Sequence, residues 1–142
     1  MITLLQYLMG RDVSHARLLT PELRANAQRT VDVANALLIL AKGGGVMLSP
    51  STWGMVRSGW RPPSVNAATQ GASKTSLHMQ CLALDLEDPF GILAAWCFAN
   101  RDRVLKDLGL WMEHPTATPT WCHVQLRPHG SFAKTGLRYF YP

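Results

Sequence analysis

Cysteine is scarce in this sequence, and its few cysteines form no recognisable pair. There are three, Cys81, Cys97 and Cys122, and no two of them have the CxxC spacing of a zinc ribbon or a redox motif. An odd number cannot all pair within one chain, so a complete disulfide framework is excluded. We therefore expect the chain to be made in a reducing compartment.

Long apolar runs are lacking as well. Residues 2–9 form the one apolar run at the N-terminus, but no basic residues precede it and no small-residue cleavage site follows it. This run therefore lacks the features of a signal peptide. No stretch of the sequence is long enough to cross a bilayer, so we expect no membrane insertion.

The basic residues are not clustered. The chain carries a formal net charge of +5, but its lysines and arginines are scattered along the sequence. Nucleic-acid-binding proteins usually gather these residues on one face or one helix, so we expect no specific binding of nucleic acid. Mild basicity equally favours association with anionic polymers such as bacterial cell walls.

What is present indicates a small globular protein. With 47% hydrophobic residues, a chain of 142 residues can bury its own core, so we expect one domain, residues 1–142, and a monomer. Thr20 followed by Pro21 is typical of a helix start, and apolar residues then recur at helical spacing until Gly43. This long helix is expected to pack one face on a sheet.

The remaining elements are shorter. Helices are predicted over residues 3–9, 89–99 and 101–108, and strands over residues 55–61, 81–86, 110–113 and 122–126. A loop with room for one helical turn is predicted over residues 66–76. The tail, residues 127–142, is predicted to return as a hairpin or an edge strand. This order of elements predicts an α+β fold, in which helices pack mainly on one side of an antiparallel sheet.

Two histidines and one aspartate have the spacing of a metal site. His78 is followed by Asp85 seven residues later and by His123 after a long gap. Two imidazoles and a carboxylate give zinc three ligands and leave the fourth position open for water, which distinguishes a catalytic zinc from a structural one. We therefore predict that one zinc ion binds in a cleft on the sheet.

The predicted strands constrain this site. His78 and Asp85 are an odd number of residues apart and would face opposite sides of one flat strand, so the chain has to bend near Cys81. On the strand at residues 122–126, His123 is expected to face the cleft because the alternate residues are apolar and face the core.

Two alternatives use the same residues differently. A lone histidine near a strand is more often a hydrogen-bonded structural residue than a ligand, and His15, His114 and His129 are by default interpreted in that way. Cys81 and Cys122 each lie close to a proposed ligand, so a structural zinc held by cysteine and histidine is possible. That alternative leaves Asp85 without a role.

The joint pattern resembles a known family. The segments Ser76-x-His78, Ala83-x-Asp85 and Trp121-x-His123, preceded by Ser58-Gly59-Trp60-Arg61-Pro62, resemble in their order the signature of the LAS-type zinc metallopeptidases. This family contains D-alanyl-D-alanine carboxypeptidases and dipeptidases, peptidoglycan endopeptidases and several phage endolysins. The resemblance covers residues 56–125, about half of the chain. It implies zinc ligation by the two histidines and the aspartate, and peptidoglycan peptides as substrates.

The resemblance also implies roles for residues around the ligands. Arg61 corresponds to the family arginine that binds a substrate carboxylate or steadies the transition-state oxyanion, for which a guanidinium fork is suited. Ser76 is expected to hydrogen-bond within the site and to hold the segment that carries His78. Trp121 and Gln125, which share a strand face with His123, are assigned to substrate binding.

The sequence departs from the family pattern at two positions. Three residues after the first histidine the family usually has glycine, where this chain has Cys81, so we expect the bend to be built without a positive φ there. Three residues before the last histidine many relatives have a catalytic glutamate, where this chain has Thr120. Glu113 is the nearest carboxylate that can take a proton from the attacking water, and His114 is the rival.

Together these features predict a zinc-dependent peptidase that hydrolyses stem or cross-link peptides of peptidoglycan. The alternative is a non-catalytic, zinc-containing module that binds cell-wall peptides. Without a signal peptide, the protein is expected to be made in the bacterial cytoplasm as a phage or prophage product. It would then reach the wall after release through a holin or as a component of a virion.

Overall fold

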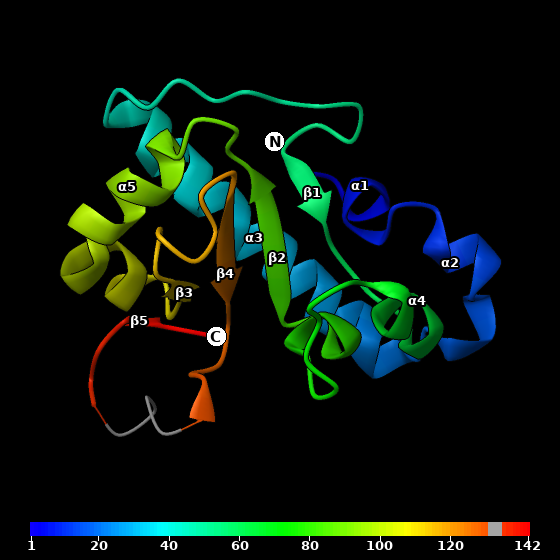
Figure 1. The fold of residues 1–142 in the computed structure, drawn as a ribbon. Helices are drawn as coiled ribbons and strands as arrows, with labels where there is room; N and C mark the ends of the chain where they lie inside the picture. The colour runs from blue at the N-terminus through cyan, green and yellow to red at the C-terminus, as the bar shows by residue number, and fades with distance from the viewer. Residues whose placement is uncertain (131–134) are drawn as a thin grey trace.

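A five-stranded sheet is the centre of the computed structural model, which describes residues 1–130 and 135–142 (Figure 1). The strands lie in the order β1-β2-β4-β3-β5. Their bounds are Val56–Ser58 for β1, Ala83–Glu87 for β2, Trp111–Glu113 for β3, Trp121–Gln125 for β4 and Tyr139–Phe140 for β5. The three pairings among β1, β2, β4 and β3 are antiparallel, whereas β5 runs parallel to β3.

The sheet is therefore mixed, and the prediction of a wholly antiparallel sheet is wrong at this edge. Parallel neighbours require a connection of about a dozen residues or more, and residues 114–138, which include β4, join β3 to β5. The predicted edge strand in the tail is present as β5. The part of that prediction that falls on residues 131–134 lies outside the described residues.

The helices account for about half of the remaining described residues. In chain order they are α1 (Leu4–Leu8), α2 (Arg11–Ser14), η1 (Ala16–Leu18), α3 (Pro21–Gly43), α4 (Pro63–Ala68), η2 (Leu77–Gln80), α5 (Ile92–Ala99) and η3 (Arg101–Leu105). Among the described residues, no helix combines the length and the apolar character needed to cross a membrane.

Several predicted bounds differ from the observed ones. Pro63 begins α4 as well as ending the extended segment, because proline is tolerated in the first turn of a helix. Residues 63–68, at the edge of the predicted loop, are therefore helical. The predicted helix over residues 101–108 begins as a π-helical turn, η3.

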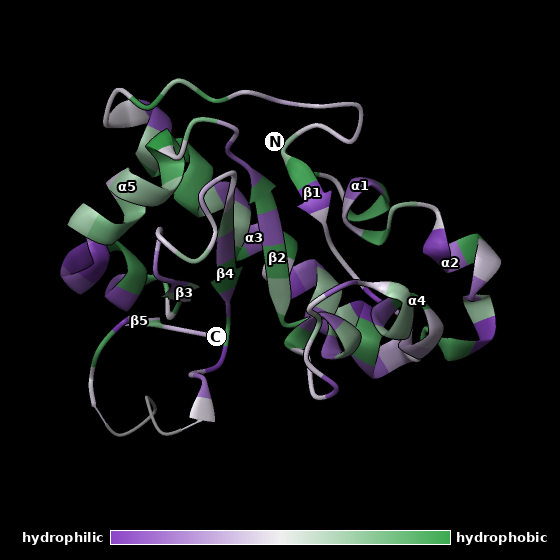
Figure 2. Cartoon of the chain, in the orientation of Figure 1, coloured by the Kyte–Doolittle hydropathy of each residue, from purple (hydrophilic) through white to green (hydrophobic). Residues whose placement is uncertain are grey.

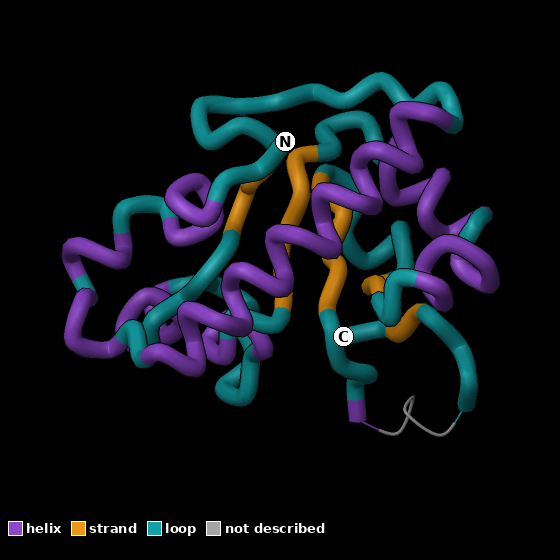
Figure 3. The backbone as a smooth tube through the Cα atoms, turned by 180° about the vertical axis from the view of Figure 1, so that it is seen from behind, coloured by secondary structure: helices purple, strands orange, loops and turns teal. Residues whose placement is uncertain are grey.

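The long helix α3 packs on one face of the sheet. It crosses behind the strands in Figure 1 and lies in front of them in Figure 3. Thr20 caps it by accepting a hydrogen bond from the Leu23 N–H at 3.2 Å, as its position before Pro21 predicts. The face it turns to the sheet is buried and includes Ala27, Val31, Ala34, Leu38 and Ala41.

Helix α5 joins α3 in covering that same face. Most of its residues are hydrophobic, as the green of Figure 2 shows. Its buried Cys97 interacts with Cys122 on β4, and Cys122 alternates with His123 along that strand. Because neighbouring side chains on a strand point to opposite faces, His123 lies on the face that α3 and α5 leave uncovered.

Helix α1 supports the edge of the sheet beside β1. Thr3 and Gln6 form a capping box at its start. The buried Tyr7 donates its hydroxyl hydrogen to the Ala83 carbonyl at 3.0 Å, and its own carbonyl accepts from the Trp60 N–H at 3.2 Å. The N-terminal helix thus positions the segment that follows β1.

Candidate metal centre

Three side chains from different elements meet on the uncovered face of the sheet. His78 comes from η2, Asp85 from β2 and His123 from β4, where Asp85 and His123 are direct cross-strand partners. One potential ligand atom of each lies within 4.8 Å of the others, and all three residues are buried. This group can hold a metal ion.

The bend that brings His78 to Asp85 is made at Cys81. Cys81 has φ 57° and ψ 29°, so the expectation that this bend avoids a positive φ is wrong. A left-handed non-glycine residue costs about 1 kcal/mol. Several hydrogen bonds offset that cost: the Leu82 N–H donates to the Leu77 carbonyl at 3.0 Å, and Thr30 donates its hydroxyl hydrogen to the Cys81 carbonyl at 2.7 Å.

Ser76 caps the turn that carries His78. Its hydroxyl oxygen accepts from the His78 N–H at 3.3 Å, so Ser76 helps to hold the segment of the first histidine. Its additional role in binding substrate stays a prediction.

The tautomer of His78 leaves one nitrogen free for a metal. Nδ1 lies 2.8 Å from the carbonyl oxygen of Gly59, which can only accept, so Nδ1 carries the hydrogen. Nε2 is buried and has no hydrogen-bond partner among the described residues, and it lies 3.4 Å from Asp85 Oδ1. Burial lowers the pKa of His78, so the imidazole is neutral, as a metal ligand has to be.

His123 is oriented in the same manner from its other nitrogen. Nε2 lies 3.0 Å from Gln125 Oε1, and the Gln125 amide is itself held by donating to the Arg127 carbonyl at 2.6 Å. Because Oε1 accepts, Nε2 carries the hydrogen and Nδ1 faces Asp85 Oδ1 at 2.7 Å. The structure thus gives Gln125 a role in orienting His123, and its predicted contact with substrate remains a prediction.

The charges in the cluster favour a cation between these groups. Burial opposes ionisation of Asp85, but the neighbouring His78 and the hydrogen bond from His123 hold its pKa well below the usual range. Burial also opposes protonation of His123, but its hydrogen bond to Asp85 and the charges of Asp85 and Glu113 raise its pKa. A metal ion held here by His123 and Asp85 would take the place of the proton between them.

Arg61 fixes the carboxylate of Asp85. Its Nε donates to Ser58 Oγ at 2.8 Å and its Nη2 to Asp85 Oδ2 at 2.5 Å. Oδ2 is therefore engaged by the guanidinium, while Oδ1 faces the two histidines. Such outer partners set the direction of a ligand and tune its basicity.

Glu113 lies on the same face of the sheet as His123. In the pairing of β3 with β4, Trp111 is opposite Gln125, and two residues further along β3 comes Glu113, which this register places beside His123. The influence of the Glu113 charge on the pKa of His123 agrees with that placement. Glu113 thus stands next to the candidate metal centre.

His114 occupies an aromatic cluster instead. Its ring stacks on Tyr141 at 4.7 Å between centroids and makes edge contacts with Phe98 and Tyr139, while Nδ1 lies 2.9 Å from Thr116 Oγ1.

We expect His114→Phe, which keeps an aromatic ring in the stack, to leave kcat within about threefold and the free energy of unfolding within about 1 kcal/mol. Steady-state kinetics and urea titration measure both, and a kcat loss above about 100-fold would instead make His114 the proton carrier.

Trp121 begins β4, at the end of the strand opposite to Gln125. Arg57 lies over its ring at 4.9 Å and donates to the Thr120 carbonyl at 3.1 Å. Thr120 therefore contributes a backbone acceptor and no proton-accepting side chain. The assignment of Trp121 to substrate binding stays a prediction.

Gly59 is a site residue that sequence reasoning did not single out. Its carbonyl oxygen holds His78, and a Cβ at this position would overlap the Tyr7 carbonyl. Gly59 belongs to the Ser-Gly-Trp-Arg segment that resembles the family motif, so the sequence did mark this position. Within that segment, however, only Arg61 was assigned a role.

We expect Gly59→Ala to act on both the fold and the metal centre. Relief of the overlap with Tyr7 has to shift the carbonyl that orients His78, which costs about 2–3 kcal/mol of unfolding free energy and about tenfold in metal affinity. Urea titration and zinc-binding calorimetry measure the two effects. Gly43→Ala, where a Cβ meets nothing within 4 Å, is the matched control, and equal behaviour of the two variants would contradict the assignment.

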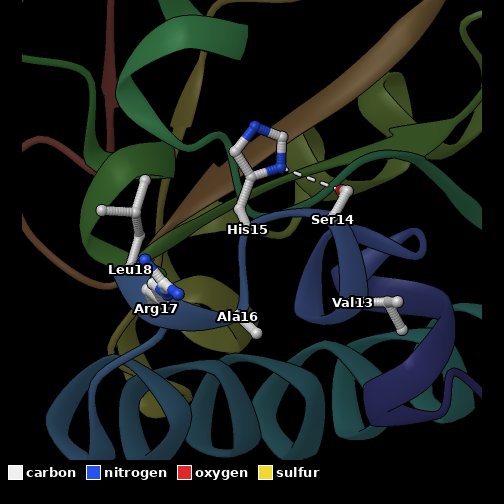
Figure 4. Close-up of a pocket in the computed structure, with 6 residues that line it drawn as sticks. All are labelled: Val13, Ser14, His15, Ala16, Arg17 and Leu18. Atoms are coloured by element: carbon white, nitrogen blue, oxygen red, sulfur yellow. Dashed lines mark hydrogen bonds between the residues drawn. The ribbon is translucent and has the colours of Figure 1, made fainter.

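A separate hollow lies away from these residues. It has a volume of about 440 Å³ and is lined by Val13, Ser14, His15, Ala16, Arg17 and Leu18 (Figure 4). His15 Nδ1 lies 2.9 Å from Ser14 Oγ, which is the structural role expected for this histidine. None of the predicted site residues lines this hollow.

No family model, curated protein or solved structure matches this chain. We therefore infer the function from the arrangement of the side chains and from the motifs in the sequence.

Proposed function

We propose that this protein is a zinc-dependent peptidase that hydrolyses stem or cross-link peptides of peptidoglycan. The observation that carries the proposal is the convergence of His78, Asp85 and His123 in one buried group, where His78 Nε2 and His123 Nδ1 both face Asp85 Oδ1. The ligand motifs in the order of the LAS-type metallopeptidases support the choice of substrate.

Zinc is the metal that suits these donors. Two imidazole nitrogens and one carboxylate oxygen form a ligand set used by catalytic zinc, and both histidines have hydrogen-bond acceptors behind them, Gly59 O and Gln125 Oε1. When bound, the ion supplies a Lewis acid that polarises the scissile carbonyl and lowers the pKa of water.

The protein groups around this centre divide the remaining work. Glu113 takes the proton of the attacking water on its carboxylate and later gives it to the leaving amine. Arg61 holds Asp85 in place through their ion pair. It also adds positive charge where the oxyanion develops, and one such donor typically stabilises the transition state by about 3–4 kcal/mol.

We further propose that the peptidase belongs to the lytic equipment of a phage or prophage. It would act on the wall after release through a holin or as a virion component. The resemblance to phage endolysins and the mild net positive charge of +5, which favours binding to anionic wall polymers, support this role.

Mass spectrometry of muropeptides tests the proposal. Purified cell wall is incubated with protein whose zinc content has been confirmed, and new peptide termini are expected among the soluble products. They identify the cleaved bond at the same time. If zinc-loaded protein releases no peptide products from any wall, the peptidase proposal fails, and co-sedimentation with wall then tests the non-catalytic binding module.

A further inference from the structure

Arg138 lies on the same face of the sheet as the candidate metal centre. In the parallel pairing of β5 with β3, Met112 is the partner of Tyr139, which places Arg138 beside Trp111. The Arg138 guanidinium carbon lies 4.2 Å from the centroid of the Trp111 ring. Trp111 is in turn the cross-strand partner of Gln125, which holds His123.

The Arg138 guanidinium has no anionic partner within residues 1–130 and 135–142. Its Nη1 is buried and makes no hydrogen bond there. A buried charged donor without an acceptor is costly, which makes such a group a candidate for ligand binding. Stacking on Trp111 holds the planar guanidinium in place, so little side-chain freedom is lost when an anion binds.

The other arginines near the centre are already engaged. Arg127 donates to Gln80 Oε1 at 3.4 Å. Arg61 donates to Ser58 and Asp85. Arg57 donates to the Thr120 carbonyl and covers Trp121. Recognition of an additional negative charge on a substrate therefore falls to Arg138.

The strand spacing locates this charge on a bound peptide. Arg138 is two strands, about 10 Å, from Gln125, and Gln125 is about 7 Å along β4 from His123, so Arg138 lies about 12 Å from the ligand group. An extended peptide covers about 3.3–3.6 Å per residue. We propose that Arg138, backed by Trp111, binds a carboxylate of an acidic peptide substrate about three to four residues from the reacting carbonyl. This inference rests on the proposed peptidase function.

Paired substrates test the subsite. The zinc-loaded wild type, Arg138→Gln and the control Arg29→Gln on α3 are assayed on a soluble acidic stem peptide and on the same peptide with its carboxylates converted to carboxamides. Arg138→Gln is expected to raise KM about tenfold on the carboxylate form and less than about twofold on the carboxamide form. An equal change on both forms, or no change on either, overturns the subsite.

Calorimetry separates failure of the subsite from failure of the peptidase proposal. The same two peptides are titrated into zinc-loaded protein, and the carboxylate form is expected to bind Arg138→Gln about tenfold more weakly than wild type. If no peptide is cleaved but this difference persists, the peptidase proposal fails while the subsite stands. If peptide is cleaved and the difference is absent, the subsite alone is wrong. Arg138→Lys, which keeps the charge, is expected to restore part of the affinity.

Discussion

Replacement of Glu113 by glutamine is expected to lower kcat by about 100- to 10,000-fold and to leave zinc affinity within about twofold. Glutamine keeps the size and polarity of the side chain but cannot accept the proton of the attacking water. Glu113 stands beside His123 on β3 and is not one of the three converging ligands. Steady-state kinetics on a cleaved muropeptide, together with zinc calorimetry, measure the two quantities.

The control for this variant is Glu22→Gln. Glu22 lies in the first turn of α3, which covers the opposite face of the sheet, and its replacement is expected to leave kcat unchanged. Retention of wild-type kcat by Glu113→Gln would show that another group carries the proton. His114→Phe then becomes the deciding variant.

Replacement of Asp85 by asparagine is expected to weaken zinc binding by more than about 100-fold and to abolish cleavage. The change removes the carboxylate from the centre of the ligand group. It also leaves Arg61 without its counter-ion where the two side chains are only 13% and 8% exposed. Loss of one member of a buried ion pair costs about 3 kcal/mol, so metal-free Asp85→Asn is also expected to unfold at a lower urea concentration.

Asp88→Asn is the matched control for the loss of a buried carboxylate. Asp88 accepts hydrogen bonds from the Leu93 and Ala94 N–H groups at the start of α5, and its replacement is expected to cost about 1 kcal/mol with zinc binding retained. Elemental analysis after gel filtration measures bound zinc, and urea titration in the presence of a chelator measures stability. If Asp85→Asn binds as much zinc as the wild type, Asp85 is not a zinc ligand.

Local signals in the sequence determined several features of the fold. Thr20 and Pro21 mark the start of α3, because a capping hydroxyl and a fixed φ act within one turn of the chain. The alternation along β4 determined that His123 faces away from the apolar core, because side chains on a strand point to opposite sides in turn. The three ligand candidates, chosen by residue type and spacing, are brought together in the structure.

The tertiary structure decided how those ligands are held. The acceptor of His78 is a backbone carbonyl 19 residues away, at Gly59. Any residue type has such a carbonyl, so the sequence contains no sign of its use. The ion pair of Arg61 with Asp85 spans 24 residues and depends on the approach of β1 to β2.

The tertiary structure also decided the left-handed bend and the far edge of the sheet. Local preference argued against a positive φ at Cys81, but hydrogen bonds from Leu82 and Thr30, the latter on α3, stabilise it. The placement of Arg138 beside Trp111 follows from the parallel pairing of β5. Residue type, spacing and motif order were thus enough to select three residues that the structure brings together in a group able to hold a metal ion. Their orientation and the charge around them arise from contacts between distant segments, which local sequence does not encode.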